Sequence, residues 1–371
     1  DGTEVEWKAL GDVTSVLRGK RLTKNLLSAE EKFPVFHGGL EPLGYYNKSN
    51  RPANTVMIIN VGASAGTVGY STVDFWSSDG CFCLEHNELL NNRFLYFALI
   101  GYQSLLKSKV RVAGIPTLDA IVVNKLLIPI PCPENPEKSL AIQSEIVRIL
   151  DKFTALTAEL TAELTAELNM RKKQYNYYRD QLLSFKEGEV EWKTLGEVAV
   201  IGTGNHDTQD AIEHGKYIFY ARGREPLKLN VFDFDETAII TAGDGAGVGK
   251  VFHYAKGKYA LHQRAYRIVP NAFMNPRFVY HYITAYFFTY IQKASVSSSV
   301  TSLRRPMFLK FPIPVPPSEE QARIVEILDK FDTLTNSITE GLPREIELRQ
   351  KQYEYYRDLL FSFPKPETVS N

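Results

Sequence analysis

The stretch TAELTAELTAEL, from Thr157 to Leu168, decides how this chain is organised. Alanine, glutamate and leucine are strong helix formers, and proline and glycine are absent from Leu140 to Phe185. The sequence therefore predicts one long helix across that window. At about 1.5 Å per residue, this helix would be roughly 70 Å long.

Apolar residues in this window recur at steps of three and four, which is the spacing of a coiled-coil seam. The predicted seam is Ile142, Ile146, Ile149, Phe153, Leu156 and Leu160, followed by Leu168, Arg171, Tyr175, Tyr178, Leu182 and Phe185, with Arg171 as its one polar member. Between the two runs the TAEL leucines step by four, and each such step rotates the apolar stripe by about 40°. Such a seam needs a partner.

A second copy of the same sequence supplies that partner. IVRILDKFTALT from Ile146 returns as IVEILDKFDTLT from Ile324, and RKKQYNYYRDQLLSF from Arg171 returns as RQKQYEYYRDLLFSF from Arg349. Both pairs are 178 residues apart, so the intervening segment has the same length in the two copies. We expect two long antiparallel helices that form a coiled coil, because the second helix must carry the chain back from where the first one delivered it.

The second copy differs from the first at Gly341 and Pro343, which should kink or break its helix. Otherwise its seam recurs at Ile324, Ile327, Phe331, Leu334, Ile338, Leu342, Ile346, Tyr353, Tyr356, Leu360 and Phe363. Two helices of this kind, each following a globular domain, would give an internal pseudo-two-fold. They would also bring the carboxyl terminus close to the amino terminus in a nearly circular molecule.

The segments before the two helices also repeat at their edges. Four features recur: EVEWK openings from Glu4 and Glu189, glycine clusters in VMIINVGASAGTVGY from Val56 and AIITAGDGAGVGKVF from Ala238, aromatic helical segments from Arg93 and Arg277, and proline-rich exits from Leu127 and Lys310. Short β-rich runs between turn residues indicate an α+β fold with two globular α/β domains. The predicted boundaries are 1–138 and 187–317 for the globular domains, 139–186 and 318–364 for the repeated long helices, and 365–371 for a tail.

Length and composition limit the class of protein. A chain of 371 residues can hold two or three domains, and we find no secretory signal and no apolar run long enough to span a bilayer, so we expect a cytoplasmic protein with no membrane partner. The three cysteines lack metal-ligand spacing, and Cys81 and Cys83 are expected to be buried on one side of a strand. Lys+Arg and Asp+Glu balance at 43 each, which argues against DNA binding by bulk charge alone.

Catalytic motifs are missing or incomplete. The glycine cluster departs from a Walker A loop, because Asp244 stands five residues before Gly249 and Val251 follows Lys250, and the dinucleotide pattern also fails. We expect these glycines to form tight turns rather than a nucleotide-binding loop. A further possibility is that they let backbone amides approach a DNA phosphate closely. Glu-x-Lys in EVEWK is weak evidence for a nuclease, and the Asn/Asp-Pro-Pro-Tyr loop of base methylases does not occur. We therefore predict no catalytic and no metal-binding residue.

Basic residues cluster in both globular segments among Asn, Gln, Ser and Tyr, a mixture suited to phosphate and base-edge contacts. The candidate DNA-binding residues are Arg18, Lys20, Arg21, Lys24, Lys107, Lys109 and Arg111 in the first segment, and Arg222, Arg224, Lys228, Lys256, Lys258, Arg264, Arg267, Arg304 and Arg305 in the second. A single basic cluster is more often just part of the solvent-exposed surface. The presence of such clusters in both segments favours a role in DNA binding.

The whole chain resembles the specificity subunit of type I restriction–modification systems, of the kind that carries TAEL repeats. The TAEL run and the paired ILDKF and KQYxYYRD segments carry the resemblance. It implies a non-catalytic subunit whose two target recognition domains each read half of a split double-stranded DNA target, with the helices as a ruler. It also implies docking of two methyltransferase subunits, to which restriction–translocase subunits add. S-adenosylmethionine, ATP and magnesium would then bind the partner subunits, with no cofactor on this chain.

Identical or similar positions in the two helix copies are the candidate docking residues. They are Lys172, Gln174 and Arg179 in the first copy and Gln350, Gln352 and Arg357 in the second. Two other classes of function remain open from the sequence. A standalone nuclease or methylase would act on DNA without a partner, and a coiled-coil scaffold with protein-binding ends would show no sequence-selective DNA binding.

Overall fold

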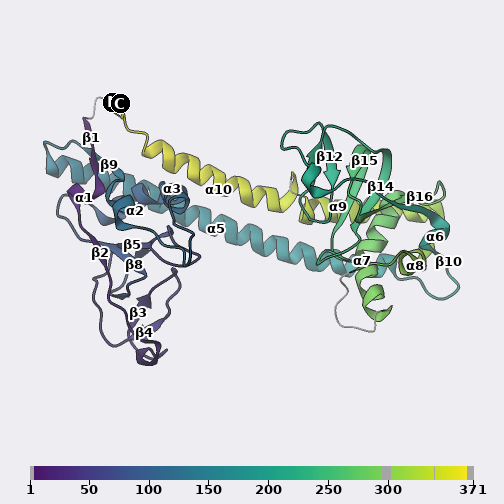
Figure 1. Cartoon of the computed structure of the whole chain (residues 1–371), viewed down its shortest axis with the longest axis horizontal. Helices are drawn as coiled ribbons and strands as arrows, with labels where there is room; N and C mark the ends of the chain where they lie inside the picture. Colours follow the sequence, from purple (N-terminus) through teal and green to yellow (C-terminus); the bar gives the residue numbers. More distant parts are fainter. Residues whose placement is uncertain (1–3, 295–301, 338, 366–371) are drawn as a thin grey trace. The chain divides into compact units, whose positions relative to one another are not determined.

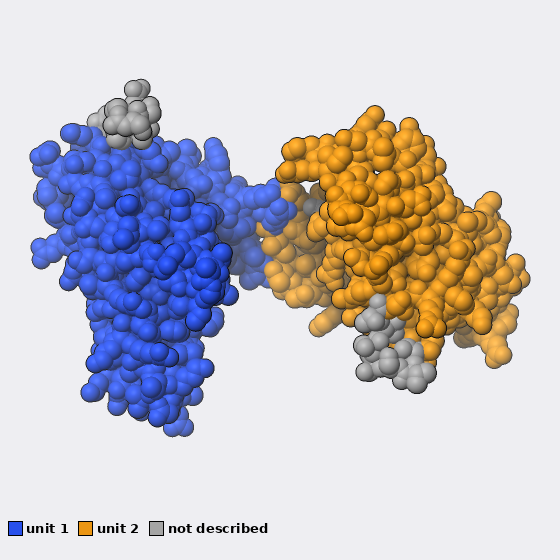
Figure 2. Space-filling view, viewed as in Figure 1, with its two compact units in different colours: residues 1–163, 347–371 blue, residues 164–346 orange. Residues whose placement is uncertain are grey.

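The computed structural model describes residues 4–294, 302–337 and 339–365. The chain forms two compact units, coloured separately in Figure 2: unit 1 comprises residues 1–163 and 347–371, and unit 2 comprises residues 164–346. Each unit thus combines one globular segment with part of each repeated helical stretch.

Helix α5, Pro136–Leu183, is the long helix predicted from the TAEL run (Figure 1). It has 48 residues and includes the whole of Thr157 to Leu168. Its start lies ahead of the predicted residue 139, because Pro136 occupies the first turn, where a missing N–H costs nothing. Asn135 completes that end, since its side-chain Oδ1 accepts a hydrogen bond from the Lys138 amide at 3.0 Å.

The second repeated stretch is two helices rather than the single long helix predicted for 318–364. Helix α9 is Ser318–Asn336, and helix α10 is Gly341–Leu360. Gly341 has φ +78°, a left-handed conformation that disfavours side chains, and a Cβ there would lie 2.5 Å from the Thr333 carbonyl oxygen. Pro343 lies in the first turn of α10. The break expected from this glycine and proline is confirmed.

The repeated motifs of the two copies meet each other inside each unit. In unit 1, Phe153 of α5 stacks on Tyr356 of α10 at 5.4 Å, and the hydroxyls of Thr154 and Tyr353 lie 3.0 Å apart. The two segments run in opposite directions in this unit, because the next residue along α5 meets an earlier residue of α10. In unit 2, Phe331 of α9 stacks on Tyr178 of α5 at 5.6 Å.

The seam prediction is wrong at Leu156, which is 51% exposed. The side chains of Thr157 and Thr161 instead line a hollow of about 400 Å³ together with Gln350 and Tyr353. Steps of four residues rotate the stripe around the helix, so the leucine spacing of the TAEL run does not continue the seam that precedes it.

Unit 1 contains three small sheets, with strand orders β1-β9, β2-β8-β5-β6 and β4-β3-β7. Strands β3 and β4 lie at the end of the unit away from α5 (Figure 1). The elements before α5 are β1 (Val5–Ala9), α1 (Leu10–Val13), β2 (Val16–Arg18), the 3₁₀ turn η1 (Lys24–Leu26), β3 (Phe33–Phe36), β4 (Gly44–Tyr46), β5 (Thr55–Ile59), β6 (Val68–Ser71), β7 (Trp76–Ser77), β8 (Cys81–Leu84), α2 (Asn92–Ile100), α3 (Gln103–Ser108), α4 (Ala120–Asn124) and β9 (Leu127–Pro131). As predicted, Cys81 and Cys83 are buried.

Unit 2 repeats this topology with longer strands that join into one six-stranded sheet, β11-β16-β14-β15-β12-β13, beside the pair β10-β17. Its elements between α5 and α9 are β10 (Glu191–Thr194), α6 (Leu195–Val198), β11 (Ala199–Thr203), η2 (Thr208–Asp210), β12 (Tyr217–Tyr220), β13 (Leu227–Leu229), β14 (Phe234–Ala242), β15 (Phe252–Leu261), β16 (Ala265–Pro270), α7 (Pro276–Ala294), α8 (Arg305–Leu309) and β17 (Pro312–Val315). Because β15 is a continuous strand of ten residues, it can pair with both β14 and β12.

The EVEWK openings form edge strands that pair with the proline-rich exits. Trp7 in β1 lies opposite Pro129 in β9, and Trp192 in β10 lies opposite Pro314 in β17. Proline has no N–H for a further ladder, so both exits can only be edges. The Trp7 indole N–H donates to the Pro364 carbonyl at 2.8 Å, so the first and last described segments of the chain meet in unit 1, as predicted.

Candidate nucleic-acid interface

The glycine cluster of unit 2 forms one side of a basic hollow of about 490 Å³. Arg222 and Arg224, which follow strand β12, line the hollow together with the loop from Asp244 to Gly247 and with Lys250. Three cationic side chains against one carboxylate give this concave surface a positive charge. A hollow of this charge suits a polyanion such as DNA.

Asp244 joins two arginines from different loops. Its Oδ1 accepts from Arg222 Nη1 at 2.8 Å, and its Oδ2 accepts from Arg264 Nη1 at 3.1 Å. Burial would raise the pKa of Asp244, but the hydrogen bonds and charges of Arg222 and Arg264 outweigh it and hold that pKa below its usual value. Asp244 is therefore ionised at neutral pH and holds the two guanidinium groups in place.

Close backbone approaches set this geometry. A Cβ on Gly243 would lie 2.7 Å from the Arg264 carbonyl oxygen, and one on Gly247 would lie 3.0 Å from the Arg222 carbonyl oxygen. Only glycine lets the loop lie so near both arginine-bearing segments. His262 is buried, and its Nδ1 accepts from the Arg264 amide at 2.9 Å, which fixes the turn that presents Arg264.

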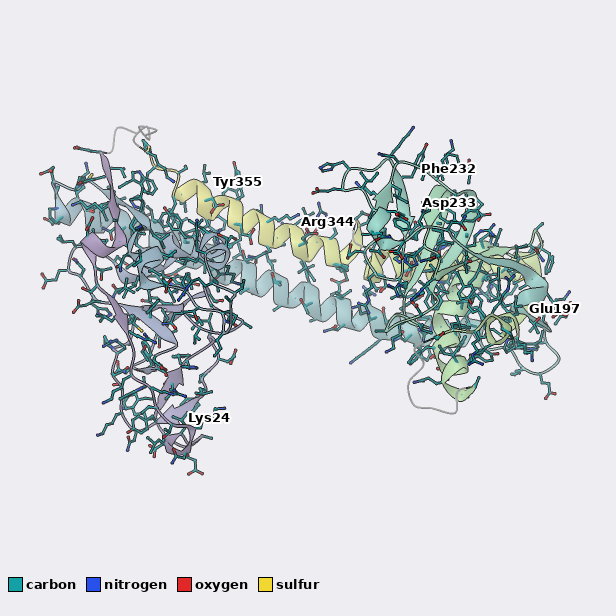
Figure 3. The ribbon with its side chains drawn as sticks, in the orientation of Figure 1. Lys24, Glu197, Phe232, Asp233, Arg344 and Tyr355 are labelled. Carbon is teal, nitrogen blue, oxygen red and sulfur yellow. The ribbon has the colours of Figure 1, made fainter. Side chains whose placement is uncertain are left out.

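A separate hollow in unit 1 has about 540 Å³ and is lined by Arg21, Lys24, His37 and Ser78, among others. It lies near the β3–β4 end of the unit, where Figure 3 labels Lys24. The His37 ring Nδ1 and the Ser78 hydroxyl are 3.0 Å apart, so a polar pair lines the same hollow as the two cations. The predicted residues Arg21 and Lys24 are thus brought together, while His37 carried no sequence signal.

Besides Arg222 and Arg264, three further predicted DNA-binding arginines are engaged in ion pairs or backbone contacts. Arg267 forms a two-bond pair with Glu236, at 2.7 and 3.0 Å, and lies over the Phe234 ring. Arg305 donates to the Ile201 carbonyl at 3.0 Å, and Arg111 pairs with Asp119. We therefore remove Arg267, which is largely buried against the sheet, from the candidate interface.

The remaining predicted basic residues are distributed over several elements. Arg18 lies in β2, Lys107 in α3, Lys228 in β13, and Lys256 and Lys258 in β15, while Lys20, Lys109 and Arg304 lie in connecting segments. Asp244 and Lys250 line the unit 2 hollow and His262 holds the Arg264 backbone, and none of the three was predicted as a site residue. The close spacing of Asp244 and Lys250 around three glycines was the signal that could have identified the loop.

The predicted docking residues of the two helix copies behave alike. Arg179 and Arg357 each donate through Nε and Nη2 to the aspartate that follows them. Gln174 accepts from Arg171, as Gln352 does from Arg349. Lys172 and Gln350 are exposed.

Two tyrosines that the sequence analysis did not single out are the most exposed aromatic residues of these helix copies. Tyr177 is 61% exposed and Tyr355 is 63% exposed, and they occupy equivalent positions. Figure 3 shows Tyr355 on α10. Each lies edge-on against the next tyrosine along the helix, so its outer face is held out to solvent.

Among the described residues, no three His, Cys, Asp or Glu side chains cluster as a metal site. Within the same ranges, no helix is long and apolar enough to cross a membrane.

Comparison with known proteins agrees with this architecture. Residues 3–170 and 187–348 match the family described as the type I restriction modification DNA specificity domain. The chain belongs to this family. It is 42% identical over 412 residues to the specificity subunit of the type I restriction enzymes EcoR124I/EcoR124II of Escherichia coli, covering 100% of this chain and 97% of that one. It is also 37% identical to the EcoprrI specificity subunit of Escherichia coli, covering 92% and 90%.

Solved structures show the same fold. The S subunit of a type I restriction–modification system from M. genitalium superposes with a TM-score of 0.56 at 19% identity, covering 99% of this chain and 98% of that one. A chain from a study of complex assembly and conformational transition of the type I R-M system gives 0.57 at 16% identity, covering 96% and 97%. The family match and the curated relatives confirm the predicted resemblance to type I specificity subunits, and with it a DNA-specificity role rather than a catalytic one.

Proposed function

We propose that this chain directs methyltransferase and restriction subunits to an asymmetric, bipartite DNA target. Unit 1 reads one half-site and unit 2 reads the other, and neither performs chemistry on the DNA. The methyltransferase and restriction–translocase partners carry S-adenosylmethionine, ATP and magnesium. The balanced charge of the chain supports this division, because a subunit with zero net charge relies on partners for much of its attraction to DNA.

One observation carries the proposal: the two units share the backbone pairing of the segments that follow β5 and β14 but carry different side chains there. In unit 1 the Asn60 amide donates to the Gly80 carbonyl, and in unit 2 the Gly243 amide donates to the Arg264 carbonyl in the same way. Equivalent positions therefore carry Gly80 in one unit and Arg264 in the other. Base edges are read by side chains, so two such surfaces favour two unlike half-sites.

In the proposed function, the helices set the spacing of the half-sites and bind the methyltransferase subunits. Helix α5 joins the globular segments of the two units in the sequence. We assign to it the spacing between the half-sites. The repeated faces around Lys172 and Gln350 bind two copies of one methyltransferase, because equivalent surfaces present the same contacts twice.

Exchange of one recognition domain tests the proposal. We expect that replacing residues 1–135 with the corresponding segment of a relative changes one half-site and leaves the other half-site and the spacing unchanged. The measurement is sequencing of methylated positions in DNA from cells that contain the variant and its partner subunits. The matched control exchanges residues 190–315 and should change only the other half-site. A change in both half-sites after either exchange would contradict the modular assignment.

A further inference from the structure

Arg264 is the most exposed member of the arginine–aspartate cluster in unit 2. Its side chain is 62% exposed, against 41% for Arg222 and 23% for Asp244. Among the described residues, the Arg264 side chain hydrogen-bonds only to Asp244, and it does so through Nη1. Its Nε and Nη2 donors therefore remain available. An arginine held at one corner with its other donors directed to solvent can still form a two-bond contact with a ligand.

The cluster holds Arg264 before any ligand arrives. Asp244 supplies the side-chain contact, Arg222 shares that carboxylate from the opposite side, and His262 fixes the Arg264 backbone. Immobilising a long side chain in advance lowers the entropy lost on binding and favours one orientation over others. A phosphate contact needs little orientation, whereas a base-edge contact needs a defined one.

On the basis of the proposed function, we propose that Arg264 reads a guanine in the major groove of the half-site bound by unit 2. Guanine presents two acceptors there, O6 and N7, and the paired donors of an arginine match them. Arg222 and Asp244 are positioning residues for this contact. Asp244 is unsuited to read cytosine itself, because both of its carboxylate oxygens already accept from arginines.

Unit 1 has no equivalent of this arginine–aspartate cluster among its described residues. The backbone pairings that place Arg264 and Asp244 in unit 2 place Gly80 and Val61 in unit 1. The Phe36 and Tyr220 carbonyls accept equivalent bonds from Ser78 and His262, so Gly38 takes the place of Arg222. No member of the arginine–aspartate cluster has a charged counterpart in unit 1, and the predicted guanine contact belongs to one half-site alone.

Methylation profiles of Arg264→Ala in the assembled complex test the assignment. We expect the half-site of unit 2, identified by exchange of residues 190–315, to contain a guanine whose preference falls about 5- to 100-fold in the variant. Asp244→Ala should weaken the preference at the same base pair. Arg224→Ala is the control: Arg224 lines the same hollow without belonging to the cluster, so its loss should lower methylation evenly across sites. An unchanged half-site of unit 1 shows that each variant is folded and assembled.

Binding to modified DNA separates a base contact from an indirect effect. We expect 7-deazaguanine at that position, which lacks the N7 acceptor, to weaken binding by the wild-type complex about 5-fold or more and to have no further effect on Arg264→Ala. Equal weakening of both proteins would overturn the assignment, as would relaxation at another base pair or in the half-site of unit 1. If the wild-type complex methylates no bipartite target, the proposed function itself fails. If the wild-type complex does methylate a bipartite target and Arg264→Ala keeps the same target, only the assignment of Arg264 fails.

Discussion

Arg93 and Arg277 join the globular segment of each unit to its repeated helix. Arg93 donates to Asp151 at 2.9 Å and Arg277 to Asp329 at 2.9 Å, which places the aspartate of each ILDKF motif in the same role. Both guanidinium groups lie over aromatic rings, which adds cation–π attraction to the ion pair. These residues therefore hold the globular segment of each unit on its helix.

Replacing Arg277 with Ala should destabilise unit 2 by about 2–3 kcal/mol, because Asp329 and Asp332 would both lose their charged hydrogen bonds to a largely buried guanidinium. The measurement is urea unfolding of the full chain, followed through the transition of unit 2. Arg323→Ala is the matched control: Arg323 also pairs with a carboxylate, Glu320, but on the exposed face of α9, so its loss should cost less than about 1 kcal/mol. Equal losses in the two variants would contradict the role of Arg277.

The effect of Arg277 should depend on pH. Burial would raise the pKa of Asp329, but hydrogen bonds from His281 and Arg277 and the charge of Arg277 hold that pKa below its usual value. A carboxylate of depressed pKa contributes stability above its unfolded-state pKa of about 3.9, and that contribution is lost as pH falls through the folded-state value. The difference between wild type and Arg277→Ala should therefore shrink below about pH 4.

At the scale of secondary-structure elements, the repeated sequence predicted the helices but not the surfaces between them. Periodicity and the absence of glycine and proline were sufficient for α5, and Gly341 and Pro343 for the break between α9 and α10. The hollow of unit 2 was not predictable in this way. Arg222, Asp244 and Arg264 come together only through the pairing of strands distant in sequence, which side-chain periodicity does not encode.

The helix copies make a prediction about assembly. Tyr177 and Tyr355 expose aromatic faces at equivalent positions, and exposed tyrosines are frequent hot spots of interfaces. Saturating the wild-type chain with methyltransferase should give two copies per chain in native mass spectrometry. Tyr177→Ala should weaken one docking site by about 1–2 kcal/mol and Tyr355→Ala the other. One methyltransferase at saturation, or the weakening of both sites by either substitution, would contradict two equivalent docking faces.

At the scale of the whole molecule, the chain contains two copies of one structural unit, and helix α5 contributes residues to both. The repeated parts are those that build the helices and attach the domains, while the side chains around the hollows differ. Under the proposed function, this arrangement would let each recognition surface change without disturbing the helix that connects them. We therefore propose that the TAEL run of α5 sets the spacing between two independent half-sites.

Deletion of one TAEL unit, Thr161 to Leu164, tests this claim most directly. The deletion shortens α5 by about 6 Å and rotates the following residues by about 40°. One base pair of B-DNA rises about 3.4 Å and turns through about 34–36°, so the rotation matches one base pair and slight bending can absorb the remaining length. Sequencing of methylated sites should show both half-sites unchanged and the unspecified gap one base pair shorter. An unchanged gap, or an altered half-site, would contradict the account.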